Sequence, residues 1–101
     1  MESITEKENG ALTLRLRGRL DTVTAPDLEK ALEDALAGTT SLTFDLSDLS
    51  YTSSAGLRVF LKAAKAMRRQ GTMKLTNVSP AIMEILEMTG FTELMTVEEK
   101  V

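Results

Sequence analysis

Two adjacent serines, Ser53 and Ser54, are the residues of this sequence best placed to take part in chemistry. They stand between a strand-like run, residues 42–46, and a segment whose helical periodicity begins near residue 54. The start of a helix presents unpaired N–H groups and the positive end of the helix dipole, and both favour a phosphate. A phosphoryl group there would add a charge of about −1.5 to −2. The spacing therefore predicts a phosphorylation or docking site at this junction.

The same serines also suit a structural role, because serine is a preferred helix N-cap and contributes roughly 1 kcal/mol there. One serine is enough for a cap, so the second hydroxyl is left over. Gly56, in the first helical turn, costs up to about 1 kcal/mol relative to alanine. Its presence indicates either close packing against the sheet or room for another molecule beside Ser54.

Three carboxylates, those of Asp21, Asp45 and Asp48, are predicted at the end of the sheet from which the helices depart. Together they could bind a cation or a basic partner, whereas each alone suits a turn or a cap. Their spacing is not specific for a metal, and we predict neither a metal site nor a cofactor.

The composition excludes several kinds of catalytic site. The 101 residues include no cysteine and no histidine. Disulfides, Cys or His metal sites, and Ser–His or Cys–His nucleophilic pairs are therefore excluded. A serine nucleophile would need a lysine or a carboxylate to activate it, and Lys62, two helical turns beyond Ser54, is poorly placed for that. We expect a protein that is not an enzyme.

Charge and hydropathy limit the kinds of partner that the protein can bind. The formal net charge is −3, which argues against binding to a nucleic acid backbone. No apolar stretch approaches the ~20 residues that span a bilayer. The first residues lack the basic start and apolar run of a signal peptide. We expect a cytoplasmic protein with no direct nucleic acid partner and no membrane contact.

Three helices are predicted from periodicity and end signals. The first begins at Thr24, with Thr24 and Asp27 as a capping box and Val23 against Leu28 as a hydrophobic staple, and it ends at Gly38. The second spans 54–70, and the third follows Ser79-Pro80 and ends at Gly90. Their methionines, Met67, Met83 and Met88, are expected in the core.

The strands alternate apolar and polar residues. Asn9-Gly10 joins runs 4–8 and 12–17 and is typical of a type I′ hairpin turn. Further strands are predicted at 42–46, 73–77 and 94–97, with 18–22 as a loop, 47–52 as a connector and 98–101 as a frayed tail. Arg15 and Arg17 alternate with leucines, so we expect one sheet face to stay solvated. The prediction is a single α/β domain over residues 1–101. Its mixed sheet has four to five strands and starts with an antiparallel hairpin, and its helices pack mainly on one face.

Residues 45–57, Asp-Leu-Ser-Asp-Leu-Ser-Tyr-Thr-Ser-Ser-Ala-Gly-Leu, resemble the signature of STAS domains, specifically of bacterial anti-sigma factor antagonists. Two more segments are similar to that family. They are Gly18-Arg19-Leu20-Asp21 with Thr24-Ala25, before the first helix, and residues 85–91, at the end of the third. The resemblance covers nearly the whole chain in order.

The resemblance implies a partner switch. In this family the unphosphorylated antagonist binds an anti-sigma factor that is also a serine kinase, and this frees a sigma factor for transcription. The kinase then phosphorylates one serine, and a PP2C-type phosphatase resets the antagonist. Alignment of the motif makes Ser54 the phospho-acceptor, with Ser53 the second choice. The partner-binding positions it implies are Asp21, Thr22, Ser53, Ala55, Gly56 and Leu57.

Many members of the family carry Asp directly before the acceptor, where this chain has Ser53. The difference leaves room for Ser53 as the cap and Ser54 as the acceptor. An alternative keeps the STAS fold without a phospho-switch, as a subunit of a larger assembly such as a stressosome-like or lipid-transport complex.

Overall fold

A computed structural model describes residues 1–100, and its centre is a five-stranded sheet in the order β1-β2-β3-β4-β5. β1 (Glu2–Glu8) pairs antiparallel with β2 (Ala11–Leu20). The remaining strands run parallel to their neighbours: β3 (Ser41–Thr52), β4 (Thr72–Val78) and β5 (Thr96–Glu99). The predicted mixed sheet with an N-terminal hairpin is confirmed.

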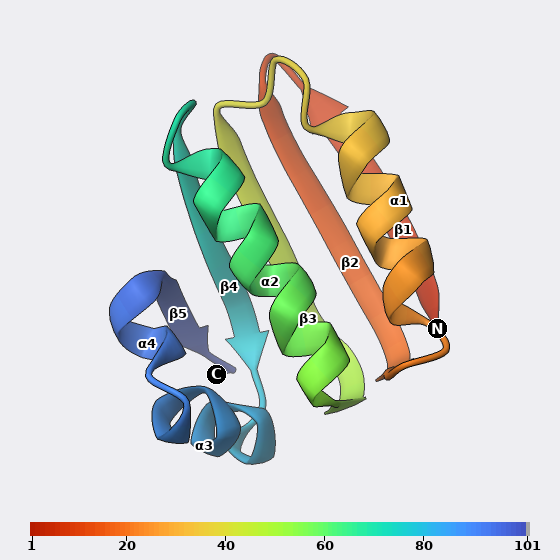
Figure 1. Ribbon diagram of the computed structural model, residues 1–101, viewed down its shortest axis with the longest axis vertical. Coiled ribbons are helices and arrows are strands. Elements are labelled where there is room, and N and C mark those ends of the chain that lie inside the picture. The colour runs from red at the N-terminus through yellow and green to blue at the C-terminus, as the bar shows by residue number, and fades with distance from the viewer. Residues whose placement is uncertain (101) are drawn as a thin grey trace.

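Helices cover one face of this sheet. α1 (Ala25–Ala35) and α2 (Ser54–Met67) lie side by side over the sheet and run roughly along its strands (Figure 1). α3 (Pro80–Met88) and the short α4 (Phe91–Leu94) follow β4. The leucines of β2 are buried beneath the helices, whereas Arg15 and Arg17 are exposed on the open face, as predicted. The longest helix has 14 residues, and none within residues 1–100 has the length and apolar character needed to cross a bilayer.

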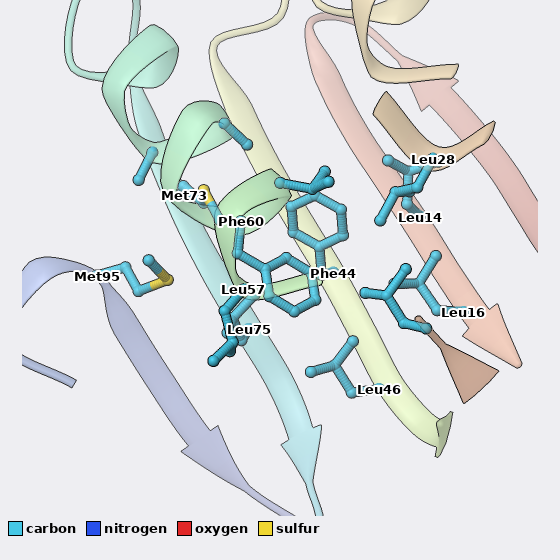
Figure 2. Packing of buried hydrophobic residues seen from close by; sticks show 14 of the residues in the cluster. Leu14, Leu16, Leu28, Phe44, Leu46, Leu57, Phe60, Met73, Leu75 and Met95 are labelled. Carbon is cyan, nitrogen blue, oxygen red and sulfur yellow. The ribbon is translucent and has the colours of Figure 1, made fainter. Parts of the chain in front are cut away.

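The core between sheet and helices fixes the position of α2. The rings of Phe44 in β3 and Phe60 in α2 meet edge to face, with centroids 5.0 Å apart and planes at 70°. Figure 2 shows this pair in the middle of the core, between Leu14 and Leu16 on one side and Leu75 on the other. Such an aromatic pair contributes about 0.5–1.5 kcal/mol beyond the area it buries. It anchors the helix that begins at Ser54.

The local signals for the hairpin and the third helix are confirmed. Asn9 and Gly10 both have positive φ, 49° and 84°, as a type I′ turn requires. Ser79 caps α3, because its Oγ accepts a hydrogen bond from Ile82 N at 3.4 Å.

Two strands are longer than the sequence predicted. β2 takes in residues 18–20 of the predicted loop, and β3 takes in the whole predicted connector, 47–52. The reason is a pair of register shifts against β2, each of which adds one residue to β3. They change the alternation, so that Leu46, Leu49 and Thr52 are all buried. Strict period-two alternation of buried and exposed residues ends at the first bulge, so the alternation predicts only the first part of β3.

The C-terminal predictions need smaller corrections. α2 ends at Met67 and not near residue 70. The predicted strand 94–97 is displaced, because α4 extends to Leu94 and β5 occupies 96–99. β5 thus takes in residues 98 and 99 of the predicted tail. Val101 lies outside the described residues. Met67 and Met83 are in the core, but Met88 is 81% exposed, so its predicted burial was wrong.

Gly71 offers a test of how closely the turn after α2 packs against the turn before β3. A Cβ added there would lie 1.8 Å from the backbone oxygen of Thr40. We expect Gly71→Ala to lower the free energy of unfolding by about 1–3 kcal/mol, measured by chemical denaturation. Arg69→Ala, an exposed neighbour, is the control and should change it by less than about 0.5 kcal/mol. Equal stability of Gly71→Ala and wild type would contradict this packing.

Candidate functional site

The junction of β3 and α2 places Ser54 on the surface. β3 ends at Thr52, Ser53 occupies the N-cap position, and Ser54 is the exposed first residue of α2. The Ser53 N–H donates to the carbonyl of Leu20 at 2.8 Å, and its own carbonyl accepts from Leu57 N at 3.1 Å. The junction is thereby tied both to the end of β2 and to the first turn of the helix.

Ser53 and Ser54 differ in their access to solvent. Ser53 has the extended backbone of an N-cap (φ −95°, ψ 177°), but its side chain makes no capping hydrogen bond. Its Oγ is buried and has no hydrogen-bond partner within residues 1–100. The expectation that the Ser53 hydroxyl caps α2 is therefore wrong, because that hydroxyl accepts no hydrogen bond from the N–H groups of the first turn. Ser54 alone of the two presents an exposed side chain.

Gly56 is where the helix meets the sheet most closely. A Cβ at this position would lie 2.4 Å from Thr52 Oγ1 and 2.6 Å from Leu20 Cγ. Of the two explanations that the sequence left open for this glycine, close packing is the one that holds. Ala55 and Leu57 are also buried, at 8% and 9% exposure. Gly56 and Leu57 therefore lie in the base beneath Ser54, and Ala55 keeps only a small exposed area, on the side of the groove described below.

Asp21 organises the entry to α1 on the neighbouring side. Its Oδ1 accepts from the N–H groups of Val23 at 3.0 Å and Thr24 at 3.1 Å, and its carbonyl accepts from Ala25 N at 2.8 Å. The Thr24 hydroxyl donates to the carbonyl of Arg19 and makes no cap, so the predicted Thr24–Asp27 capping box is wrong. The predicted staple is wrong too, because Val23 is 79% exposed.

Hydrogen bonding also shifts the ionisation of two carboxyl groups. The N–H of Thr24, helped by that of Val23, holds the pKa of Asp21 below its ordinary 3.8. Burial opposes ionisation of Asp45, but hydrogen bonds from Ser47 N–H and from Asn77 Nδ2 outweigh it, and its pKa is also lowered. Arg15 Nε lies 3.7 Å from the second oxygen of Asp45. Both carboxylates therefore serve local structure.

The three aspartates do not combine into a cation site. Asp48 is exposed in β3, while Asp45 is held by Asn77 and Arg15 and Asp21 by the turn before α1. Among residues 1–100 no group of three carboxylates is placed to hold a metal ion. The separate turn and capping roles that the sequence also allowed are those found for Asp21 and Asp45.

A groove of about 320 Å³ runs between α1 and α2, and it reaches Ala55, the residue after Ser54. Thr22, Ala25, Pro26, Glu29, Ala55, Arg58, Val59 and Lys62 line it. Lys62 pairs with Glu29 across the groove. A second, almost wholly apolar hollow of about 180 Å³ continues along the same helices past Leu32 and Ala63. A further hollow of about 520 Å³ lies at the other end of α2, where Ala64, Met67 and Arg68 line it.

Comparison with known proteins identifies the family. The family model described as the STAS domain matches residues 2–101. The chain belongs to the STAS domain family. BtrV of Bordetella bronchiseptica is 35% identical to this chain over 99 residues, covering 96% of the chain and 85% of BtrV. The anti-sigma-B factor antagonist of Listeria monocytogenes is 32% identical over 98 residues, covering 94% of the chain and 85% of its own length.

Solved structures share the STAS fold. An anti-sigma factor antagonist from Mycobacterium paratuberculosis has a TM-score of 0.88 and 23% identity, with 96% of this chain and 84% of that one covered. The Bacillus cell fate determinant SpoIIAA in its phosphorylated form has a TM-score of 0.77 and 20% identity, with 95% and 90% covered. The resemblance inferred from the motif at residues 45–57 is thus confirmed for family and fold.

Two exposed residues near the junction were not singled out as site candidates from the sequence. Arg58 lines the groove, and its position four residues after Ser54 is a helical spacing that could have revealed it. Val23 is an exposed apolar side chain next to Thr22. Its exposure was not predictable, because it depends on the turn that Asp21 imposes.

The close contact at Gly56 predicts a sharp cost for a single methyl group. Gly56→Ala should lower the free energy of unfolding by about 1–3 kcal/mol, since Thr52 and Leu20 must move to admit the Cβ. Ser54→Ala, on the exposed side of the same turn, is the matched control and should stay within about 0.5 kcal/mol of wild type. Urea denaturation measures both, and a neutral Gly56→Ala would argue for open space at this position.

The lowered pKa of Asp21 predicts a pH-dependent contribution to stability. Because the folded pKa lies below the unfolded value, the contribution is present above about pH 4 and is lost as the pH falls through the folded pKa. Asp21→Asn keeps an acceptor oxygen without a titrating charge. Denaturation at pH 7 and pH 3 should therefore show a smaller acid loss for Asp21→Asn than for wild type. Identical losses would contradict a role for the ionised carboxylate.

Proposed function

We propose that this chain is an anti-sigma factor antagonist whose binding to its partner is switched off by phosphorylation at Ser54. In its unphosphorylated form it binds an anti-sigma factor that is also a serine kinase, and so releases a sigma factor. Relatives with the name anti-sigma-B factor antagonist support the general role, as does the SpoIIAA fold, known in a phosphorylated form. The proposal is for a cytoplasmic STAS domain, residues 1–101, that acts by binding and not by catalysis.

The observation that carries the choice of Ser54 is the contrast between the two serines. Ser54 is exposed at the first position of α2, whereas the Ser53 hydroxyl is buried. A kinase must bring ATP to the acceptor oxygen, so the exposed hydroxyl is the suitable substrate. A phosphate at this position also meets the positive end of the α2 dipole.

The proposed partner surface combines this serine with the mouth of the groove. Thr22 and Pro26 line it from the α1 side, and Arg58 lines it from the α2 side. Val23 and Ser54 are the exposed sequence neighbours of the lining residues Thr22 and Ala55. Asp21 sets the position of Thr22 and Val23 through its turn. In this proposal Ser53, Ala55, Gly56 and Leu57 shape the surface from beneath, since they are buried or half-buried.

The proposed reaction chemistry belongs to the partners. The kinase transfers the phosphoryl group to Ser54, and a PP2C-type phosphatase removes it. Lys62, the lysine weighed as an activator of a serine nucleophile, is instead paired with Glu29. The chain supplies an accessible hydroxyl on a rigid base, which is what a substrate of two opposing enzymes requires.

Variants at the two serines separate the switch from a structural role. Ser54→Asp should weaken binding to the purified anti-sigma factor at least about tenfold, or roughly 1.4 kcal/mol, because it adds negative charge to the contact surface. Ser54→Ala should bind as wild type does. Isothermal titration calorimetry measures both affinities. The matched charge control is Thr96→Asp on the distant strand β5, because the Ser53 side chain is too buried for Ser53→Asp to change surface charge alone.

Phosphorylation itself is read by mass spectrometry. Incubation with the anti-sigma factor and ATP should add the mass of one phosphoryl group to wild type and to Ser53→Ala, and none to Ser54→Ala. Fragment spectra should place the group on Ser54. Tight binding by Ser54→Asp, or a phosphoryl group carried on Ser53, would overturn the proposal.

A further inference from the structure

Arg58 lies one helical turn beyond Ser54 on the same side of α2. Both side chains are exposed. Residues four apart on a helix have their Cβ atoms about 5–6 Å from each other, within easy reach of an arginine side chain. The guanidinium group can donate two parallel hydrogen bonds to phosphate oxygens. The spacing therefore puts a phosphate-binding group beside the exposed serine.

Arg58 has no carboxylate of its own to bind. The ion pairs within residues 1–100 are Arg15–Asp45 and Lys62–Glu29. Lys62, one further turn along the same face, is thus neutralised, whereas Arg58 is not. The first turn of α2 contains no acidic residue, and the N-cap hydroxyl of Ser53 makes no hydrogen bond. Within residues 1–100, Arg58 therefore makes no ion pair, and no acidic side chain of the first turn of α2 competes for it.

Arg58 also borders the groove between α1 and α2. Across the groove from it lie Thr22 and Pro26, and Ala55 and Val59 supply apolar surface on its own helix. An arginine beside the apolar part of a groove suits a partner that inserts an apolar side chain there and presents a carboxylate next to it. The same guanidinium is thus within reach both of a ligand in the groove and of Ser54.

We infer that Arg58 is the switch residue of this surface, since it binds the phosphoryl group of phosphorylated Ser54 and is thereby withdrawn from the partner. The inference rests on the proposed function for the identity of the modification. In the unphosphorylated chain Arg58 is available to an acidic group of the partner. In the phosphorylated chain it is occupied by the chain's own phosphate. Phosphorylation then removes a favourable contact as well as adding charge.

The test uses the full chain with phosphoserine inserted at position 54 during translation, so that no kinase is needed. The second ionisation of phosphoserine has a pKa of about 6 and is followed by ³¹P NMR. A nearby guanidinium favours the dianion, so Arg58→Gln should raise this pKa by about 0.3 units, the size expected for an exposed pair four residues apart. Arg68→Gln is the matched control, since Arg68 is the C-cap of α2, roughly 21 Å along the helix axis from position 54, where salt screens its charge from the phosphate.

A second measurement needs no substitution. The ¹⁵N-coupled Nε–H resonance of Arg58 should move when phosphoserine replaces Ser54, and should move again as the phosphate titrates. An unchanged Arg58 resonance, or equal effects of Arg58→Gln and Arg68→Gln on the phosphate, would overturn the inference. Because the phosphate is installed directly, these outcomes are independent of whether a kinase modifies Ser54. Failure of kinase labelling would count against the proposed function alone.

Discussion

The close contact between the first turn of α2 and the ends of β2 and β3 is the constraint on which the site depends. Gly56 allows this contact, because any Cβ would collide with Thr52 and Leu20. The Phe44–Phe60 pair holds the rest of the helix against the same sheet. Because these two contacts fix the position of α2 on the sheet, the position of Ser54 at the surface follows from packing.

The surface chemistry follows from this packing. Where the helix packs on the sheet, the Ser53 hydroxyl is buried and the Ser54 side chain is exposed. Two chemically identical hydroxyl groups therefore differ in their access to solvent. The junction is also tied to β2 through the Leu20 carbonyl, and Asp21 directly after Leu20 sets the neighbouring turn. A rigid base of this kind suits a switch in which charge changes at the surface while the fold persists.

Much of this was accessible from the sequence, because local signals agreed with the fold. The Asn9-Gly10 turn, the leucine alternation in β2 and the Ser79 cap each depend on a few adjacent residues. The errors arose where distant contacts decide the outcome. The bulges that extend β3 depend on pairing with β2, and the burial of the Ser53 hydroxyl depends on how far α2 sinks toward the sheet. The exposure of Val23 likewise depends on the Asp21 turn, which displaced the expected capping box.

The central claim is that phosphorylation of Ser54 alters one surface without altering the fold. Comparison of backbone amide ¹H–¹⁵N spectra of the unmodified chain and the chain with phosphoserine at 54 tests this claim most directly. The account predicts shifted resonances confined to residues 21–26 and 53–62, around the groove, with β1, β4 and β5 unchanged. Shifts spread across those three strands would show that the phosphate acts by remodelling the domain, and would contradict the account.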